Sequence, residues 1–198
     1  MVNNFFPTPI YSNKIDSELL TKIKVNLFEY IKENKDLFKT TQWKCNTKTN
    51  IFCEQGREFF PDYLKELILE HTSRYIVEGK FKHRPFIIED CWVTLGGYGA
   101  FQELHDHMAA GVPTNGFSAV LYISIEPNKG GEFLLQSPID TLVKILPESD
   151  NDLLSPQIHI EPEEGLLLSF PSWIKHGSLQ YNSKKKKRIS ISWNVNFQ

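Results

Sequence analysis

The residues after Pro85 constrain the fold more than any other part of the chain. Short runs rich in Val, Ile, Phe, Tyr and Trp are separated there by clusters of Gly, Pro, Asn and Ser, which is typical of all-β proteins. We expect this many short strands to form a sandwich or jelly roll rather than a parallel sheet. The predicted strands cover residues 86–95, 101–107, 117–125, 131–136, 157–160, 165–170 and 188–195.

The first 85 residues have a different pattern. Apolar residues at helical spacing predict one helix over 17–33, with Asp16 or Ser17 as its N-cap, and a second over 61–77. Two prolines predict an extended start over 5–11, and residues 35–57 are polar and irregular. The 198 residues fit a single domain, in which 1–85 add a strand and helices to a β core over 86–198. The candidate buried stripe of the second helix is Leu64, Leu67, Ile68, His71 and Tyr75.

Composition narrows the range of partners. The formal net charge is −2 and the pI is near 6.3, so no global electrostatic argument points to nucleic acid or to an anionic membrane. No apolar stretch is long enough to cross a bilayer, and the start of the chain lacks the pattern of a signal peptide. Three cysteines without metal-motif spacing indicate reduced thiols. We therefore expect a cytoplasmic protein, and pairing into a homodimer through a sheet edge stays open.

The most informative motif is His105-Asp106-His107. Side chains alternate along a strand, so the two imidazoles point to one face and Asp106 to the other. His176, far downstream, can complete a facial set of three ligands. Imidazoles with open coordination positions suit an Fe(II) that binds a co-substrate and oxygen together, although three histidines and a water also make a zinc site. The sequence predicts a metal site formed by His105, His107 and His176.

Neighbours of the pair leave alternatives open. A bulge could turn Asp106 inward, which would give the two-histidine, one-carboxylate arrangement usual for non-heme Fe(II) oxygenases. Either His107 or Asp106 therefore remains possible as the second ligand. Glu103 shares the strand face of the histidines and is a candidate to orient an imidazole, as is Gln102.

A second motif begins twelve positions after His176. Arg188, Ser190 and Ser192 alternate on one face of the last predicted strand, whose other face is apolar. A buried arginine needs an anionic partner, its planar fork suits a carboxylate, and a serine hydroxyl adds a donor. We expect Arg188 and Ser190 to bind the far carboxylate of a dicarboxylate co-substrate. The preceding lysine run, 184–187, is more typical of a solvated turn.

Taken together, these motifs resemble the 2-oxoglutarate- and Fe(II)-dependent oxygenase superfamily. The similarity extends from Cys91 to Asn196, and its histidine-x-histidine form resembles a branch of phage and bacterial oxygenases. The segments that carry it are Tyr98-Gly99 with Gln102 and His105-Asp106-His107, Leu121-Tyr122-Ile123, Gly130–Phe133, Gly165–Trp173 leading into His176, and Arg188-Ile189-Ser190.

The resemblance implies a mainly β fold with N-terminal helices, whose core is a cupin-like double-stranded β-helix. It implies a dioxygenase that couples decarboxylation of 2-oxoglutarate to oxidation, such as hydroxylation, of an unidentified substrate, with Fe(II), 2-oxoglutarate and O2. His105, His107 and His176 would hold the iron. Arg188 and Ser190 would hold the C5 carboxylate of 2-oxoglutarate, with Tyr122 as a further donor. The superfamily usually has a carboxylate where this chain has His107, which implies a slower, redox-retuned or differently metallated site. A phage-encoded chain would act in the host cytoplasm.

Two other functions fit the same residues. One is a three-histidine, cupin-like dioxygenase that needs no 2-oxoglutarate and uses Arg188 for a substrate carboxylate. The other is a non-catalytic β-sandwich that binds a metal or small ligand. The substrate, a small molecule or a peptide, is not readable from the sequence. We expect the loop 108–115 and the N-terminal helices to wall the pocket. Four aromatic residues are more typical of a core than of a substrate platform: Trp92, Tyr98, Trp173 and Trp193.

Overall fold

The computed structural model describes residues 8–40, 48–51, 61–108, 116–139 and 155–198. These residues form two α-helices, α1 (Ser17–Glu33) and α2 (Asp62–Glu78), a short 3-10 helix η1 (Lys35–Leu37), and strands that all pair antiparallel. The strands are β1 (Tyr11–Lys14), β2 (Lys39–Thr40), β3 (Lys48–Ile51), β4 (Phe86–Gly96), β5 (Gln102–His105), β6 (Gly116–Ser124), β7 (Phe133–Gln136), β8 (Gln157–Ile160), β9 (Leu166–Pro171), β10 (His176–Ser178) and β11 (Arg188–Phe197).

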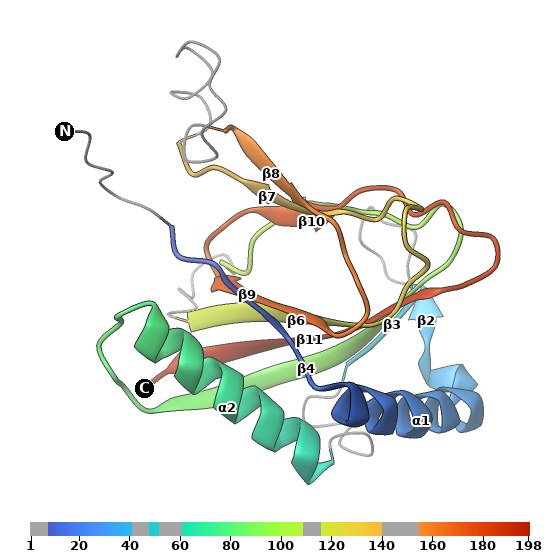
Figure 1. Ribbon diagram of the computed structural model, residues 1–198, viewed down its shortest axis with the longest axis horizontal. Coiled ribbons are helices and arrows are strands. Elements are labelled where there is room, and N and C mark those ends of the chain that lie inside the picture. The colour runs from blue at the N-terminus through green and yellow to red at the C-terminus, as the bar shows by residue number, and fades with distance from the viewer. Residues whose placement is uncertain (1–7, 41–47, 52–60, 109–115, 140–154) are drawn as a thin grey trace.

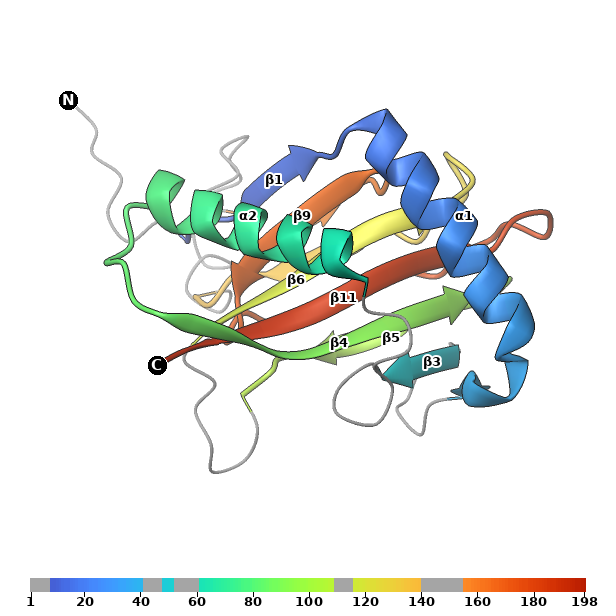
Figure 2. The same ribbon diagram turned by 90° about the horizontal axis from the view of Figure 1, so that it is seen from below.

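The strands form two sheets that face each other. The larger has the order β1-β9-β6-β11-β4-β3-β2, and the smaller has the order β5-β10-β7-β8 (Figure 1). Both helices lie across the outer face of the larger sheet (Figure 2). This arrangement confirms the predicted jelly roll, with helices contributed by the N-terminal residues.

Alternation along the strands of the larger sheet separates two layers of side chains. In β11, Ile189, Ile191, Trp193 and Val195 belong to the core shared with the helices. The residues between them face the smaller sheet, where a second core holds mainly residues of β6, β7 and β9. The inner face of β11 is polar, which places hydroxyls and a guanidinium between the sheets.

The helices form where the sequence predicts them. Asp16 caps α1, since its Oδ1 accepts hydrogen bonds from the backbone N–H groups of Glu18 and Leu19 at 2.8 and 3.1 Å. The predicted stripe of α2 is buried throughout. His71 within it lies 2.8 Å from the hydroxyl of Tyr11, so this histidine ties β1 to α2 and has a structural role.

Several predictions need correction. Residues 35–57, predicted as irregular, contain the paired strands β2 and β3, and β10 is a strand that the sequence did not reveal. The helices do not wall the pocket described below, because they cover the opposite face of the sheet. Of the predicted extended start over 5–11, residues 5–7 lie outside the described residues, and β1 begins at Tyr11. Most of the loop 108–115 lies outside the described residues, as do Cys45 and Cys53.

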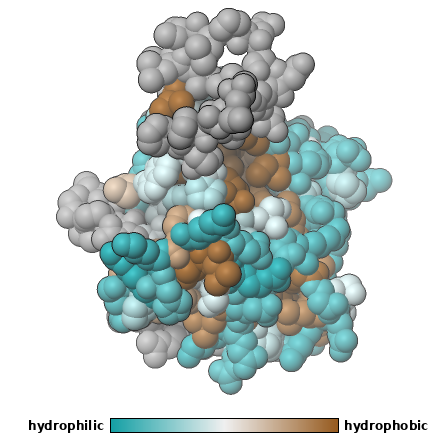
Figure 3. Space-filling view, turned by 60° about the vertical axis from the view of Figure 1, so that its left-hand side comes forward, coloured by the Kyte–Doolittle hydropathy of each residue, from teal (hydrophilic) through white to brown (hydrophobic). Residues whose placement is uncertain are grey.

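Neither helix among the described residues could cross a membrane. Neither α1 nor α2 combines the length and the apolar character needed to span a bilayer, and no other described segment is a long helix. Hydrophobic residues reach the surface in patches between hydrophilic ones on the face shown in Figure 3.

One acidic residue is half-buried at the end of the polar inner face. Asp90 of β4 pairs with Asn194 of β11, whose side-chain oxygen accepts a 2.8 Å hydrogen bond from Ser118 of β6. Burial, with a smaller contribution from Glu89, raises the pKa of Asp90 from 3.8 to about 6, although hydrogen bonds from Asn194 oppose the shift. Its Oδ1 is buried without a hydrogen-bond partner among the described residues. The ionised form of Asp90 therefore destabilises the fold.

We expect Asp90→Asn to stabilise the protein at neutral pH. Below pH 3.8, the pKa in the unfolded chain, the carboxyl of Asp90 is protonated in both states and does not affect the free energy of unfolding. Between pH 3.8 and about 6 the unfolded chain loses this proton and the folded protein keeps it, so the free energy of unfolding falls as pH rises. The gain should be roughly 2 kcal/mol, less than the full shift implies because Asp90 is partly exposed to solvent. Urea unfolding at pH 5 and pH 7.5 measures it, with Glu66→Gln, an exposed carboxylate of α2, as control. An unchanged pH dependence in Asp90→Asn would contradict this account.

Candidate active site

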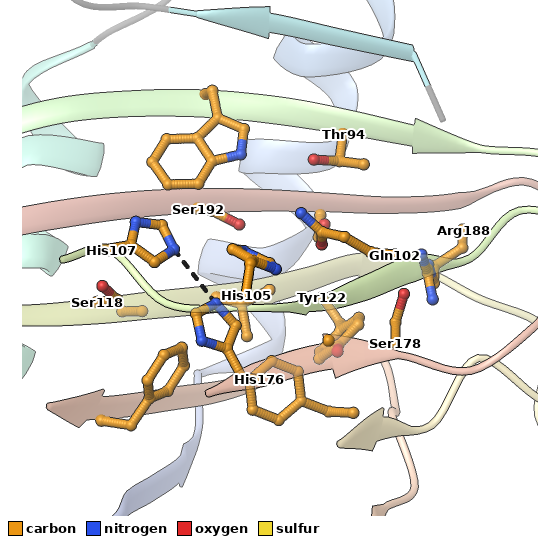
Figure 4. Close-up of a pocket in the computed structure, with 17 residues that line it drawn as sticks. Thr94, Gln102, His105, His107, Ser118, Tyr122, His176, Ser178, Arg188 and Ser192 are labelled. Atoms are coloured by element: carbon orange, nitrogen blue, oxygen red, sulfur yellow. Dashed lines mark hydrogen bonds between the residues drawn. The ribbon is translucent and has the colours of Figure 1, made fainter. Parts of the chain in front are cut away.

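Three histidines meet on the smaller sheet. His105 ends β5, His107 lies two residues beyond it, and His176 begins β10, where it pairs directly with His105. One nitrogen of each ring lies within 4.8 Å of those of the other two (Figure 4). The Nε2 atoms of His107 and His176 are 3.2 Å apart. Two nitrogens that bind one metal at right angles, each about 2.1 Å away, would be separated by about 3 Å, so His107 and His176 have the spacing of two ligands of one metal ion.

Backbone carbonyls fix the tautomers of two of these rings. The Nδ1 atoms of His105 and His176 lie 2.9 and 3.0 Å from the carbonyl oxygens of Glu103 and Ile174. A carbonyl only accepts hydrogen bonds, so each Nδ1 carries the proton and each Nε2 keeps its lone pair. The contact to His105 is made by the backbone carbonyl of Glu103 and not by its carboxylate, which was the partner predicted from the sequence.

Asp106 is not part of the cluster. Its Oδ1 accepts a 3.0 Å hydrogen bond from the backbone N–H of Met108, which caps the turn after β5. Of the two candidates for the second ligand, the structure brings His107 to the other histidines.

A bulge in β5 adds a residue that alternation alone would turn away. In the pairing with β10, His176 lies opposite His105 and Ser178 opposite Gln102, so the three residues 176–178 of β10 match the four residues 102–105 of β5. The extra residue brings Gln102 into the same pocket as His105. Gln102 was a candidate neighbour of the ligands from its sequence motif, and the register explains how it reaches the site.

His107 lies beyond the end of its strand and is held by other contacts. Its backbone N–H donates to the carbonyl of Ser172 at 2.9 Å. Its ring is nearly parallel to that of His176 and stacks with Trp92, with interplanar angles of 12° and 24°. Trp92 therefore lines the site rather than the core, whereas Trp193 is a core residue, as the sequence favoured.

Burial keeps the three imidazoles neutral. Desolvation is the first cause in each case: it lowers the pKa of His105, that of His107 to about 4, and that of His176 well below its ordinary value. Repulsion between the rings adds to the effect for His107 and His176. A neutral imidazole binds a metal without first losing a proton, so the site is prepared for a cation at neutral pH.

The larger sheet supplies a second polar group. Arg188 is 4% exposed, and its guanidinium donates a 3.3 Å hydrogen bond to the carbonyl of Gly131. A Cβ on Gly131, whose φ is +84°, would lie 3.2 Å from that guanidinium, so glycine leaves room for it. Ser190 pairs with Tyr122 on the neighbouring strand. Burial raises the pKa of Tyr122 to about 12 against the opposing effect of Arg188, so its hydroxyl stays protonated and can donate.

The three histidines and the polar group around Arg188 line one pocket between the sheets (Figure 4). No aspartate or glutamate is among the described residues that line it, which suits an anionic ligand. Several of the described residues that line it were not predicted as site residues, because their position depends on how the sheets pair, among them Trp92, Thr94, Ser178 and Ser192.

Comparison with known proteins identifies the family. A family model described as "Putative 2OG-Fe(II) oxygenase" matches residues 90–194, more than half of the chain. The chain belongs to the 2OG-Fe(II) oxygenase family. The matched segment contains the three histidines, Tyr122, Arg188 and Ser190. A search of curated proteins found no match to the sequence.

Solved structures of this family share the fold. A Pseudomonas putida prolyl-4-hydroxylase has a TM-score of 0.70 at 16% identity, over 96% of this chain and 94% of that one. A viral collagen prolyl hydroxylase from Paramecium bursaria Chlorella virus-1, in complex with 2OG, has a TM-score of 0.57 at 16% identity, over 94% and 96%. EctD from S. alaskensis with 2-oxoglutarate and 5-hydroxyectoine has a TM-score of 0.65 at 11% identity, over 96% and 72%. The double-stranded β-helix is therefore confirmed.

Family membership gives the reaction class. This 2OG-Fe(II) oxygenase is an oxidoreductase that uses Fe(II), 2-oxoglutarate and O2, as the sequence motifs predicted. The finding favours that reading over the dioxygenase without 2-oxoglutarate and over the non-catalytic sandwich.

We expect Trp92→Leu to weaken metal binding by about 10-fold, because outer partners that hold a ligand ring typically contribute that much. An anaerobic Fe(II) titration measures it. Trp173→Leu is the matched control, since Trp173 is 44% exposed and does not line the pocket. Equal affinities in the two variants would show that the stacking does not hold His107.

Proposed function

We propose that His105, His107 and His176 hold the Fe(II) of this oxygenase, and that Arg188, Ser190 and Tyr122 hold the C5 carboxylate of 2-oxoglutarate. The observation that carries the proposal is the shared pocket: three neutral imidazoles from the smaller sheet and a buried guanidinium from the larger one line the same space. A 2-oxoacid with a second carboxylate matches both ends of this pocket, since its 2-oxoacid group can bind the metal and its second carboxylate can pair with the guanidinium.

Charge balance supports this assignment. With three neutral ligands the iron keeps its full double positive charge, and Arg188 adds a third positive charge to a pocket lined by no described carboxylate. Dianionic 2-oxoglutarate compensates most of that charge. A carboxylate ligand in place of His107 would compensate one of these positive charges. The charge of this site therefore depends more on the co-substrate than that of a site with two histidines and one carboxylate.

Bound Fe(II) supplies the open coordination positions and the redox chemistry that couple 2-oxoglutarate decarboxylation to oxidation of the substrate. The protein positions these ligands and shields the site from water. The carbonyls of Glu103 and Ile174 keep the lone pairs of His105 and His176 directed at the metal. Arg188 is held in place, because it is buried and its guanidinium donates a hydrogen bond to the backbone carbonyl of Gly131, just before β7. Tyr122 remains a donor throughout the neutral range.

We also propose that the enzyme acts in the cytoplasm. The proposal is supported by the odd number of cysteines, three without metal-motif spacing, which suits a reducing compartment. Among the described residues Cys91 is a free thiol, and burial raises its pKa, so it is unreactive.

An anaerobic titration tests the metal ligands. Fe(II) followed by 2-oxoglutarate should produce a weak visible charge-transfer band only when both are present. His107→Ala should lower Fe(II) affinity by more than about 100-fold, beyond the effect of losing an outer partner. Asp106→Ala is the matched control, because that carboxylate caps a turn outside the cluster, and it should keep the band. A band that survives in His107→Ala and disappears in Asp106→Ala would reverse the assignment.

Arg188→Ala tests the co-substrate anchor. Removing one partner of a buried charge pair should raise the dissociation constant for 2-oxoglutarate at least about 30-fold while Fe(II) affinity stays near the wild-type value. High 2-oxoglutarate concentration should then restore turnover. Arg74→Ala, which removes an exposed arginine of α2, serves as control. Unchanged 2-oxoglutarate affinity in folded Arg188→Ala would refute the anchor.

A further inference from the structure

Ser178 has a hydroxyl that the fold itself does not use. The residue is 8% exposed, and its Oγ is buried with no hydrogen-bond partner among the residues that the structure describes. An unpaired buried hydroxyl destabilises the folded state, so native proteins rarely keep one without a reason. The hydroxyl also lines the pocket that contains the histidines and Arg188.

The backbone prevents this side chain from turning away. Ser178 pairs with Gln102 of β5 on one side and with Phe133 of β7 on the other. It stands two residues after His176, so strand alternation directs both side chains to the inner face. In Figure 4 the Ser178 hydroxyl points toward the end of the pocket where Arg188 lies. The position is built into the smaller sheet.

The surroundings define what this hydroxyl can bind. Across the pocket stand the guanidinium of Arg188 and the hydroxyls of Ser190 and Tyr122, all buried on the larger sheet. The guanidinium only donates, whereas the hydroxyls of Ser190 and Tyr122 can donate as well as accept. A ligand carboxylate suits this place, because its oxygens can accept from Ser178 and from these groups together and its charge matches the guanidinium.

We propose that Ser178 donates a hydrogen bond to the C5 carboxylate of the co-substrate, so that this group is held from both sheets. The inference rests on the proposed function of Arg188. It adds a selectivity role: Ser178 favours a 2-oxoacid that ends in a second carboxylate over one of the same length that ends in a methyl group. Ser178 is a binding residue here and takes no part in the chemistry at the iron.

The test compares two co-substrates of equal chain length, 2-oxoglutarate and 2-oxopentanoate, which lacks only the C5 carboxylate. Dissociation constants come from anaerobic titrations of the Fe(II) protein followed by the charge-transfer band, so turnover is not needed. Ser178→Ala should weaken 2-oxoglutarate binding by about 10- to 100-fold, the usual contribution of a hydrogen bond to a charged group. It should leave 2-oxopentanoate binding unchanged, so the preference between the two falls by the same factor.

Two variants control the experiment. Ser178→Thr keeps the donor and should retain most of the preference. Ser169→Ala removes a buried serine of β9 that does not line the pocket, and it should change neither constant. If Ser178→Ala does not fold, Ser178→Cys, which has a similar shape and a much weaker donor, replaces it.

The outcomes separate the two proposals. A wild-type protein that binds both 2-oxoacids equally would refute the carboxylate anchor itself. A wild-type protein that discriminates, with a Ser178→Ala variant that discriminates just as strongly, would refute only the role of Ser178. An equal loss for both co-substrates would mean that Ser178 shapes the pocket without contacting the carboxylate, which also overturns this inference.

Discussion

The structure depends on the alternation of side chains along the central strand of the larger sheet. β11 lies between β4 and β6, and its apolar residues, among them Ile191 and Trp193, pack against the helix-side core. That burial fixes the register of the strand, because a slip of one residue would exchange its two faces. Arg188 and Ser190 therefore reach the pocket as a consequence of how the opposite face packs. The position of the proposed anchor is therefore set by a hydrophobic core on the opposite face of the strand.

The histidine end of the pocket depends on burial and on backbone hydrogen bonds rather than on the register of β11. All three histidines belong to the smaller sheet or to the turn after it, and their neutrality is a result of burial. Desolvation would penalise a charged imidazole, while backbone carbonyls select the tautomer of His105 and His176 that presents Nε2. A carboxylate at position 107 would pay a desolvation cost of its own in such a place. The histidine at 107 thus suits a pocket whose negative charge arrives with the co-substrate.

The sequence predicted the features that local patterns encode and missed those that depend on pairing between distant strands. The helices, the jelly roll, the histidine pair and the alternation around Arg188 follow from spacing alone. The bulge that brings Gln102 beside His105 depends on the register between β5 and β10, which no local pattern shows. β10 is three residues long and contains a glycine, so it carries no strand signal. Trp92 looked like a core residue because apolar aromatics of a strand usually are.

Dividing the site between two sheets links ligand binding to folding. The second core is small and shares its space with hydroxyls, a guanidinium and three imidazoles, none of which adds the stabilisation that apolar side chains would. In the proposed assignment, a metal and a dicarboxylate would contact both sheets and would bind only when the sheets are packed in register. They would then stabilise the native state by mass action, in proportion to the logarithm of their concentration over their dissociation constants. The polar interior would thus gain from its ligands the contacts between the sheets that apolar side chains provide elsewhere.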